Sequence, residues 1–151
     1  MKKQLQLIVF GCLLGASIAH AQENAGLKLP AGFKAQLFAE NIGQARHIAI
    51  TQSGVLFAKL NYPNKEGKSI IRLEDKNNDG VAEKITGWAN YGGTGIYVRG
   101  DNLYASSDDA VYQYKLDANN EVLNASSPNT IIKGLLSRRQ HASKSITLDP
   151  K

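Results

Sequence analysis

The sequence predicts an all-β fold of the β-propeller class, and three observations lead to that prediction. Short runs rich in Val, Ile, Leu, Phe and Tyr alternate with Gly, Asn, Asp and Pro, as in strands joined by tight turns. No stretch after the amino terminus carries a sustained helical period of apolar residues. Strand motifs recur at the length of a four-stranded propeller blade, about 40 to 50 residues.

The first 21 residues are predicted to be a secretory signal peptide. Met1-Lys2-Lys3 precedes an apolar run from Leu5 to Ile18, and Ala19-His20-Ala21 supplies the small residues of a cleavage site. The run is shorter than the roughly 18 to 20 residues that span a bilayer, so no stable membrane span is expected. We expect a periplasmic or secreted protein, with residues 22–151 as the amino-terminal blades of a propeller.

Composition excludes several classes of protein. The 151 residues are 42% hydrophobic and 21% charged, as in soluble globular chains. The single cysteine cannot form an intramolecular disulfide framework, and no Cys/His cluster suggests a zinc or iron–sulfur site. Removal of Lys2 and Lys3 lowers the formal net charge from +5 to +3, without basic clusters interleaved with aromatics, so nucleic acid is not an expected partner.

The expected strands follow the apolar runs in chain order. They are Phe33 to Ala39, Ala45 to Thr51, Val55 to Leu60, Ser69 to Glu74, Glu83 to Trp88, Gly95 to Arg99, Asn102 to Ser106, Ala110 to Leu116, Thr130 to Lys133 and Lys144 to Asp149.

The strand motifs repeat along the chain. Leu56-Phe57-Ala58 returns 47 residues later as Leu103-Tyr104-Ala105. The preceding strand, Ile48-Ala49-Ile50, returns 48 residues later as Ile96-Tyr97-Val98 and after another 50 as Ile146-Thr147-Leu148. Four strands fill each interval, which favours propeller blades over the alternative of a β-sandwich.

The repeat also predicts an incomplete propeller. Residues 148–151 align with residues 50–53, inside the turn after the first strand of a blade. We therefore expect two blades and the first strand of a third, from a chain truncated relative to the four to eight blades of a closed ring. Self-assembly of several copies into a ring is the alternative.

Residues just before the innermost strands are the natural site candidates, because they lie beside the central channel. Arg46, Thr94 and Lys144 share one position of the repeat, and cations there could hold an anionic ligand through its carboxylates. The alternative is a rim of solvated charges. His141 is a candidate general base, and the neighbouring cations Arg138, Arg139 and Lys144 favour its neutral form. A structural or surface histidine would explain the same residue, and His47 is similarly ambiguous.

The run Asp75 to Gly80 resembles the first half of a calcium loop. The twelfth position is Thr86 where a bidentate glutamate belongs, and Glu83 is the only later acid in the window. A tight Asn/Asp/Gly turn accounts for the same residues and is the favoured reading, so no metal ligand is predicted.

Five motifs together resemble the sorbosone dehydrogenase and soluble aldose sugar dehydrogenase family, whose members use pyrroloquinoline quinone (PQQ) and fold as six-bladed propellers. The motifs are Leu29-Pro30-Ala31-Gly32-Phe33, Ala45-Arg46-His47-Ile48, Asp75 to Glu83, Gly92-Gly93-Thr94-Gly95-Ile96 and Arg139-Gln140-His141-Ala142-Ser143-Lys144-Ser145.

The resemblance implies oxidation of a sugar or sugar-derived aldehyde, with hydride passing to PQQ and a periplasmic acceptor taking the electrons. His141 matches the family's proton-accepting histidine, and Arg46, Arg139, Gln140 and Lys144 become candidate cofactor contacts. Related enzymes commonly carry arginine where this chain has Lys144, which keeps the charge but loses the planar fork. Most other quinone contacts, and any calcium ligands, are expected in later blades, so this segment alone is expected to be inactive.

Two alternatives to the enzyme remain open at the level of sequence. A non-enzymatic propeller that serves as a binding module would use the same blades. A calcium-binding structural module would instead depend on the Asp75 to Glu83 turn.

Overall fold

The computed structural model describes residues 23–137 and 144–149, and the predicted signal peptide lies outside them. The chain divides into two units, residues 1–35 and residues 36–151. The described part of the first unit holds a short 3-10 helix, Glu23–Gly26, and the Asn24 side chain accepts a hydrogen bond from the Ala35 N–H at 3.3 Å.

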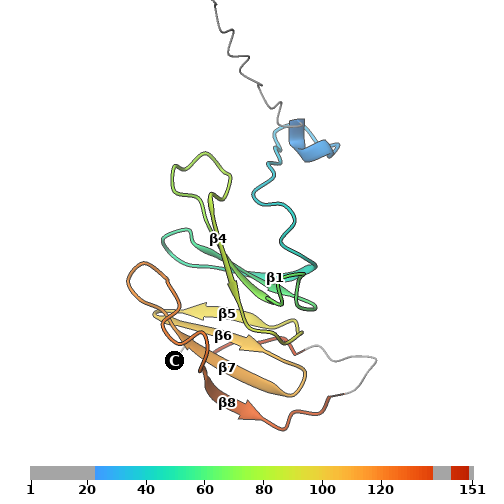
Figure 1. The fold of residues 1–151 in the computed structure, drawn as a ribbon. Helices are drawn as coiled ribbons and strands as arrows, with labels where there is room; N and C mark the ends of the chain where they lie inside the picture. Colours follow the sequence, from blue (N-terminus) through green and yellow to red (C-terminus); the bar gives the residue numbers. More distant parts are fainter. Residues whose placement is uncertain (1–22, 138–143, 150–151) are drawn as a thin grey trace, which may run out of the picture. The chain divides into compact units, whose positions relative to one another are not determined.

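Two four-stranded sheets make up the second unit, and each is antiparallel with its strands in sequence order (Figure 1). The first sheet contains β1 (Ala45–Ile50), β2 (Leu56–Leu60), β3 (Ile70–Glu74) and β4 (Lys84–Trp88). The second contains β5 (Ile96–Arg99), β6 (Asn102–Ser106), β7 (Ala110–Lys115) and β8 (Asn129–Lys133). These sheets are the two predicted blades, and the fold is a partial β-propeller.

Two of the ten predicted strands are wrong. No strand forms over residues 33–39, where Phe38 and Ala39 cover an apolar patch of the first sheet and Phe38 makes one backbone hydrogen bond, from the Ala82 N–H to its carbonyl. Residues 144–149 also carry no strand, since no described segment forms a ladder with them. Both segments carry the apolar alternation of a strand but pair with no described strand, and in the first of them Phe33 (69% exposed) and Leu37 (48% exposed) are not buried.

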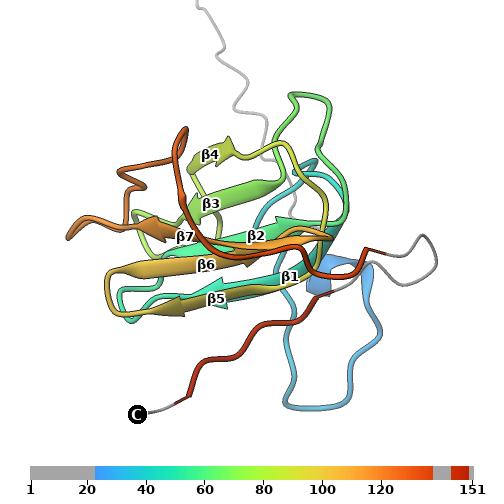
Figure 2. The ribbon, with the colours of Figure 1, turned by 90° about the horizontal axis from the view of Figure 1, so that it is seen from below.

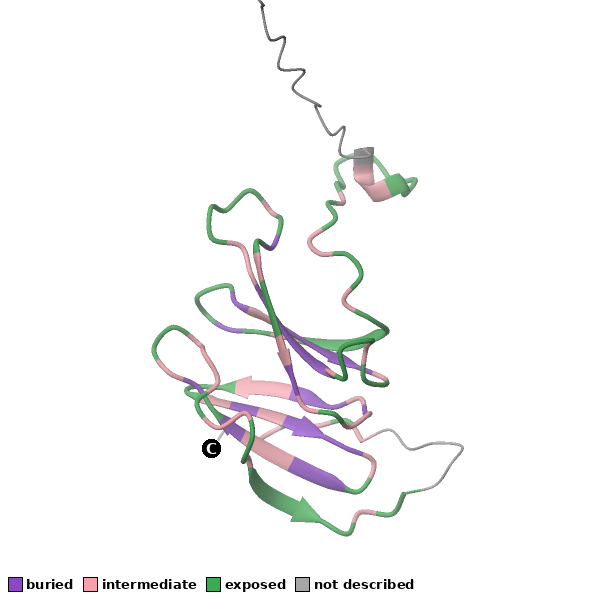
Figure 3. Cartoon of the chain, in the orientation of Figure 1, coloured by how far each residue is buried: buried purple, intermediate pink, exposed green. Residues whose placement is uncertain are grey.

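The two blades approach each other most closely through their first strands, and β1 lies beside β5 (Figures 1 and 2). The core between the blades joins Phe57, Ile70 and Trp88 of the first sheet to Leu103 and Tyr114 of the second. The Trp88 ring meets Phe57 and Tyr114 edge to face, at centroid distances of 6.1 and 5.7 Å. Buried residues are concentrated on β2 and β3, whereas β8 is exposed throughout (Figure 3).

Two ends of the sheets can be distinguished from the strand directions. We call the end at which β1 and β5 begin the mouth end, because a propeller channel opens between such strands. Antiparallel pairing brings the β2–β3, β4–β5 and β6–β7 connections to the mouth end. The β1–β2, β3–β4 and β7–β8 connections lie at the opposite end.

At the opposite end, a buried arginine joins the two blades. Arg72, 1% exposed, donates from Nε to the Asn120 carbonyl at 2.9 Å and from Nη2 to the Asn119 carbonyl at 2.8 Å. Its Nη1 pairs with Glu74 at 2.8 Å and lies 3.4 Å from Glu121. The hydrogen bond from Arg72 lowers the pKa of Glu74. This cation therefore fixes the β7–β8 connection of the second blade to β3 of the first.

Replacement of Arg72 by alanine should lower the free energy of unfolding by about 3 kcal/mol, because two carbonyls and a carboxylate lose a buried partner. Urea unfolding of the full chain measures this change. Lys84→Ala is the control: Lys84 pairs with Glu121 at 2.5 Å but is 38% exposed, so its loss should cost under about 1 kcal/mol. Equal losses in the two variants would contradict a specific role for Arg72.

Candidate functional site

Arg46 lies at the mouth end as the extra residue of a β-bulge. Ala45 pairs with Leu60 and His47 with Lys59, so Arg46 has no opposite residue on β2. Bulges redirect a side chain and are common next to active sites. The Arg46 side chain is exposed, and within the described residues it has no hydrogen bond or ion pair. It is thus a cation at the start of the innermost strand that remains available to a ligand.

The segment Tyr91–Gly95, which we call the mouth loop, leads into β5 and is packed tightly against protein backbone. A Cβ atom at Gly92, Gly93 or Gly95 would come closer than 3.0 Å to a carbonyl oxygen of Asn61, Ser106 or Lys144, respectively. Gly93 also has φ +142°, a conformation that L side chains rarely adopt. These glycines are therefore required by contacts inside the protein, and a phosphate ligand is not needed to explain them.

Lys144 is held next to the mouth loop by Ser106. The buried Ser106 hydroxyl accepts a hydrogen bond from the Gly95 N–H at 2.9 Å and donates to the Lys144 carbonyl at 2.6 Å. Arg46, Thr94 and Lys144 thus all lie at the mouth end, as their shared position in the repeat predicts.

The other predicted site residues, Arg139, Gln140 and His141, lie outside the described residues. Their roles stay predictions. In the sequence they stand within the six residues that directly precede Lys144.

A buried lysine, which sequence reasoning did not select, lies under the mouth loop. Lys59 is fully buried on β2, and its Nζ donates to the carbonyls of Tyr91 at 2.8 Å and Leu60 at 3.2 Å. The ammonium also lies 4.8 Å from the centre of the Tyr91 ring, within the range of a cation–π contact. Burial lowers the pKa of Lys59 to about 8, and the charge of Asp108 partly opposes this shift.

Tyr91 is anchored on its other sides by the second blade. Its hydroxyl shares a hydrogen bond with that of Tyr114 at 2.8 Å, and its ring packs on Tyr112 at a centroid distance of 4.8 Å. Burial, and to a smaller extent the proximity of Tyr114, raises the pKa of Tyr91.

The only signal for Lys59 in the sequence is a charged residue inside the apolar run Leu56 to Leu60.

The turn between β3 and β4 gathers three carboxylates. Ligand oxygens of Asp75, Asp79 and Glu83 lie within 4.8 Å of one another, a group that could hold a metal ion among the described residues. The oxygens of Asp75 accept hydrogen bonds from the Asp79 and Gly80 N–H groups, and Glu83 accepts from Lys76. Such bonds within the turn are those of a tight Asn/Asp/Gly turn, which is the interpretation that the sequence favours.

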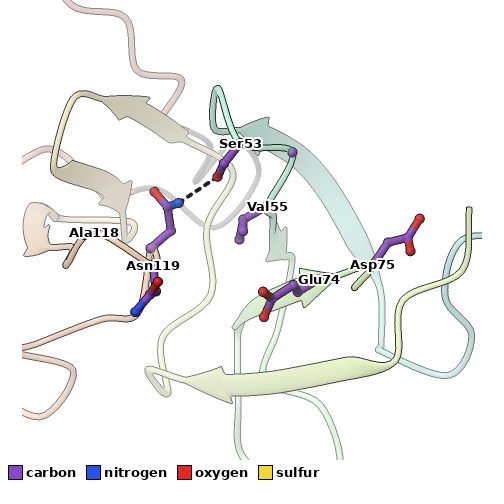
Figure 4. Close-up of a pocket in the computed structure, with 8 residues that line it drawn as sticks. Ser53, Val55, Glu74, Asp75, Ala118 and Asn119 are labelled. Atoms are coloured by element: carbon purple, nitrogen blue, oxygen red, sulfur yellow. Dashed lines mark hydrogen bonds between the residues drawn. The ribbon is translucent and has the colours of Figure 1, made fainter. Parts of the chain in front are cut away.

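The second unit has a cavity at the opposite end and a depression beside the mouth end. A cavity of about 190 Å³ at the opposite end is lined by Ser53, Glu74 and Asn119 among others, and the Asn120 amide donates to the Ser53 hydroxyl across it at 2.8 Å (Figure 4). A broader depression of about 680 Å³ adjoins the segment before β1 and is lined by residues that include Gln44 and Tyr62. Gln44 stands two residues before Arg46, so this second depression adjoins the mouth end.

Comparison with protein families matches residues 27–151 to the TrAA12-like model. The chain belongs to the TrAA12-like family. No curated protein matches the sequence. This family assignment covers both blades and the stretch that contains Arg46, His141 and Lys144.

Solved structures resemble this TrAA12-like chain in fold. The PQQ domain of a pyranose dehydrogenase from Coprinopsis cinerea, in its holo form, has a TM-score of 0.64 at 18% identity over 83% of this chain. Iodide and calcium structures of a Trichoderma reesei carbohydrate-active enzyme of family AA12 each give a TM-score of 0.62 at 18% identity over 76% of this chain. The chain spans 29% of the length of each of these structures.

No helix among the described residues is long and apolar enough to cross a membrane.

Titration of Lys59 should make the stability of the chain depend on pH. Its folded pKa, about 8, is below the ordinary 10.5, so between these values the unfolded chain binds more protons and stability rises with pH. The difference in unfolding free energy between the wild type and Lys59→Met should increase by about 1.4 kcal/mol per pH unit across this window.

Urea unfolding at intervals between pH 8 and 10.5 measures this difference. Lys133→Met, at an exposed position on β8, is the control for the loss of a lysine, and the pH dependence in Lys59→Met should exceed that in this variant. A flat difference curve for Lys59→Met would show that Lys59 is not desolvated.

Proposed function

We propose that this TrAA12-like chain contributes two blades to an exported, PQQ-dependent dehydrogenase that oxidises a sugar or a sugar-derived aldehyde. The observation that carries the proposal is the arrangement at the mouth end, where Arg46 is exposed on a bulge and Lys144 is fixed beside the mouth loop. The fold likeness to a pyranose dehydrogenase PQQ domain supports it. The predicted signal peptide supports export.

The donors at the mouth suit an anionic cofactor. PQQ carries carboxylates, and arginine and lysine side chains bind carboxylates through charge-assisted hydrogen bonds. The Arg46 side chain makes no hydrogen bond or ion pair within the described part of the chain, and Lys144 is half-buried next to Gly95. We assign Arg46 and Lys144 to the carboxylates, with Arg139 and Gln140 as further contacts.

The bound quinone supplies a hydride acceptor. This chain supplies the base: His141 takes the proton from the substrate hydroxyl on its imidazole nitrogen as the hydride leaves the adjacent carbon. A neutral imidazole is required, and the cations near it in the sequence, Arg138, Arg139 and Lys144, favour that form. A periplasmic electron acceptor would complete the turnover.

The depression before β1 suits a sugar that approaches the mouth. Tyr62 is 65% exposed there, and an exposed aromatic ring offers an apolar face to the C–H surface of a sugar. The Gln44 side-chain amide has no partner within residues 23–137 and 144–149, so it can bind a hydroxyl. We propose that this depression is part of the route for the substrate.

In the full-length protein loaded with PQQ, His141→Ala should reduce dye reduction with aldoses by about 100-fold or more, because the general base is lost. Steady-state rates over a panel of aldoses measure the effect. His47→Ala, the matched change at an exposed histidine on β1, should retain activity. PQQ binding without turnover by the wild type would favour the binding-module alternative, and undiminished rates in His141→Ala would contradict the mechanism.

Loss of the Tyr62 ring should weaken substrate binding without changing the chemical step. Tyr62→Ala should raise KM for the sugar by roughly tenfold and leave kcat nearly unchanged, since binding to the ring is the same in the ground and transition states. Tyr62→Phe keeps the ring and should behave like the wild type. A fall in kcat at constant KM would exclude the depression as a substrate route.

A further inference from the structure

Two fully buried side chains occupy the same position in successive blades. The repeat aligns Leu56 to Leu60 with Leu103 to Ser107, so Lys59 and Ser106 are equivalent positions of the two blades. Both side chains are 0% exposed, and both donate a hydrogen bond to a backbone carbonyl of a later segment. For Lys59 this is the segment that leads into β5, and for Ser106 it is the segment that begins at Lys144, which the repeat aligns with the start of β5 but which forms no strand. Lys59 binds the Tyr91 carbonyl at 2.8 Å, and Ser106 binds the Lys144 carbonyl at 2.6 Å.

The lysine makes the more extensive of these two contacts. Its ammonium bonds the Tyr91 carbonyl and lies against the Tyr91 ring, so it fixes both the backbone and the side chain at the start of the mouth loop. Two residues on, the Gly93 N–H donates to the Asn61 carbonyl at 3.3 Å, a long hydrogen bond that contributes little to holding this part of the loop.

We propose that Lys59 is a positioning residue of the mouth-end site: it holds the mouth loop in the position that ligand binding requires. Lys59 does not itself reach a ligand, because its side chain is fully buried and its Nζ is directed to the Tyr91 carbonyl. The inference rests on the proposed function for the identity of the ligand, PQQ. That Lys59 holds the mouth loop rests only on its contacts with Tyr91, whatever the ligand is.

Lys59→Met tests the proposal in the full-length protein, since it keeps the length of the side chain but removes the donors. Amide hydrogen exchange of Gly93 should accelerate at least tenfold, whereas strand amides such as those of Phe57 and Leu103 should keep their wild-type protection. The affinity for PQQ, followed by absorbance or calorimetry, should fall at least tenfold. If Lys59→Met does not fold, Lys59→Gln retains one shorter donor and should give intermediate changes.

Arg72→Met is the matched control, because Arg72 is also a buried cation between the blades but lies at the opposite end. It should lower global stability while it leaves the protection of Gly93 relative to the strands, and the affinity for PQQ, unchanged. This comparison separates positioning of the loop from a general loss of stability.

Three results would overturn the proposal. They are an unchanged Gly93 exchange rate in Lys59→Met, an unchanged PQQ affinity in that variant, or an equal loss of affinity in Arg72→Met. Absence of PQQ binding by the wild type would instead overturn the proposed function, and the exchange rates would still decide whether Lys59 holds the loop.

Discussion

The structure depends on the burial of two cations between the blades. Lys59 and Arg72 lie on adjacent strands of the first sheet, and each donates to main-chain carbonyls outside that sheet's strands. Lys59 binds the Tyr91 carbonyl before β5, and Arg72 binds the Asn119 and Asn120 carbonyls between β7 and β8. An ammonium or guanidinium removed from water is costly unless its donors find acceptors in fixed positions. The apolar core around Trp88 brings the sheets together, and these polar contacts favour a single relative placement of the blades.

That placement determines the geometry of the mouth. The mouth loop passes between carbonyls of Asn61 and Ser106, so closely that only glycine fits at several of its positions. Tyr91 at one end of the loop is fixed by Lys59, and Gly95 at the other end by Ser106. Because Ser106 also binds the Lys144 carbonyl, the same network extends to the segment that carries the predicted base, His141. A ligand site at the mouth is therefore coupled to the packing between blades.

The sequence predicted the parts of the fold that depend on local pattern. Eight strands, their order and the blade repeat follow from apolar alternation and turn residues. Residues 33–39 and 144–149 have the same alternation, but strand formation also requires a neighbouring segment in register, which a local pattern does not contain. Arg46 and Lys144 lie at the mouth end, where the repeat places them, and their part in binding a cofactor stays a prediction, whereas no sequence pattern pointed to Lys59. Its role depends on a carbonyl 32 residues away, and no motif reports such a contact.

The difference between Lys59 and Ser106 shows how one repeat can serve two different loops. The repeat aligns Thr94 with Lys144. Ser106 binds the carbonyl at this shared position, that of Lys144, whereas Lys59 binds the carbonyl of Tyr91, three residues before Thr94. A long side chain reaches further along the next segment than a short one, so the loop before β5 can be held at a different point from the loop before Lys144. The position in the strand is shared, and the length of its side chain selects which residue of the next segment is fixed. Exchange of a single buried residue can thereby reshape the mouth while the strands, and hence the propeller fold, are kept.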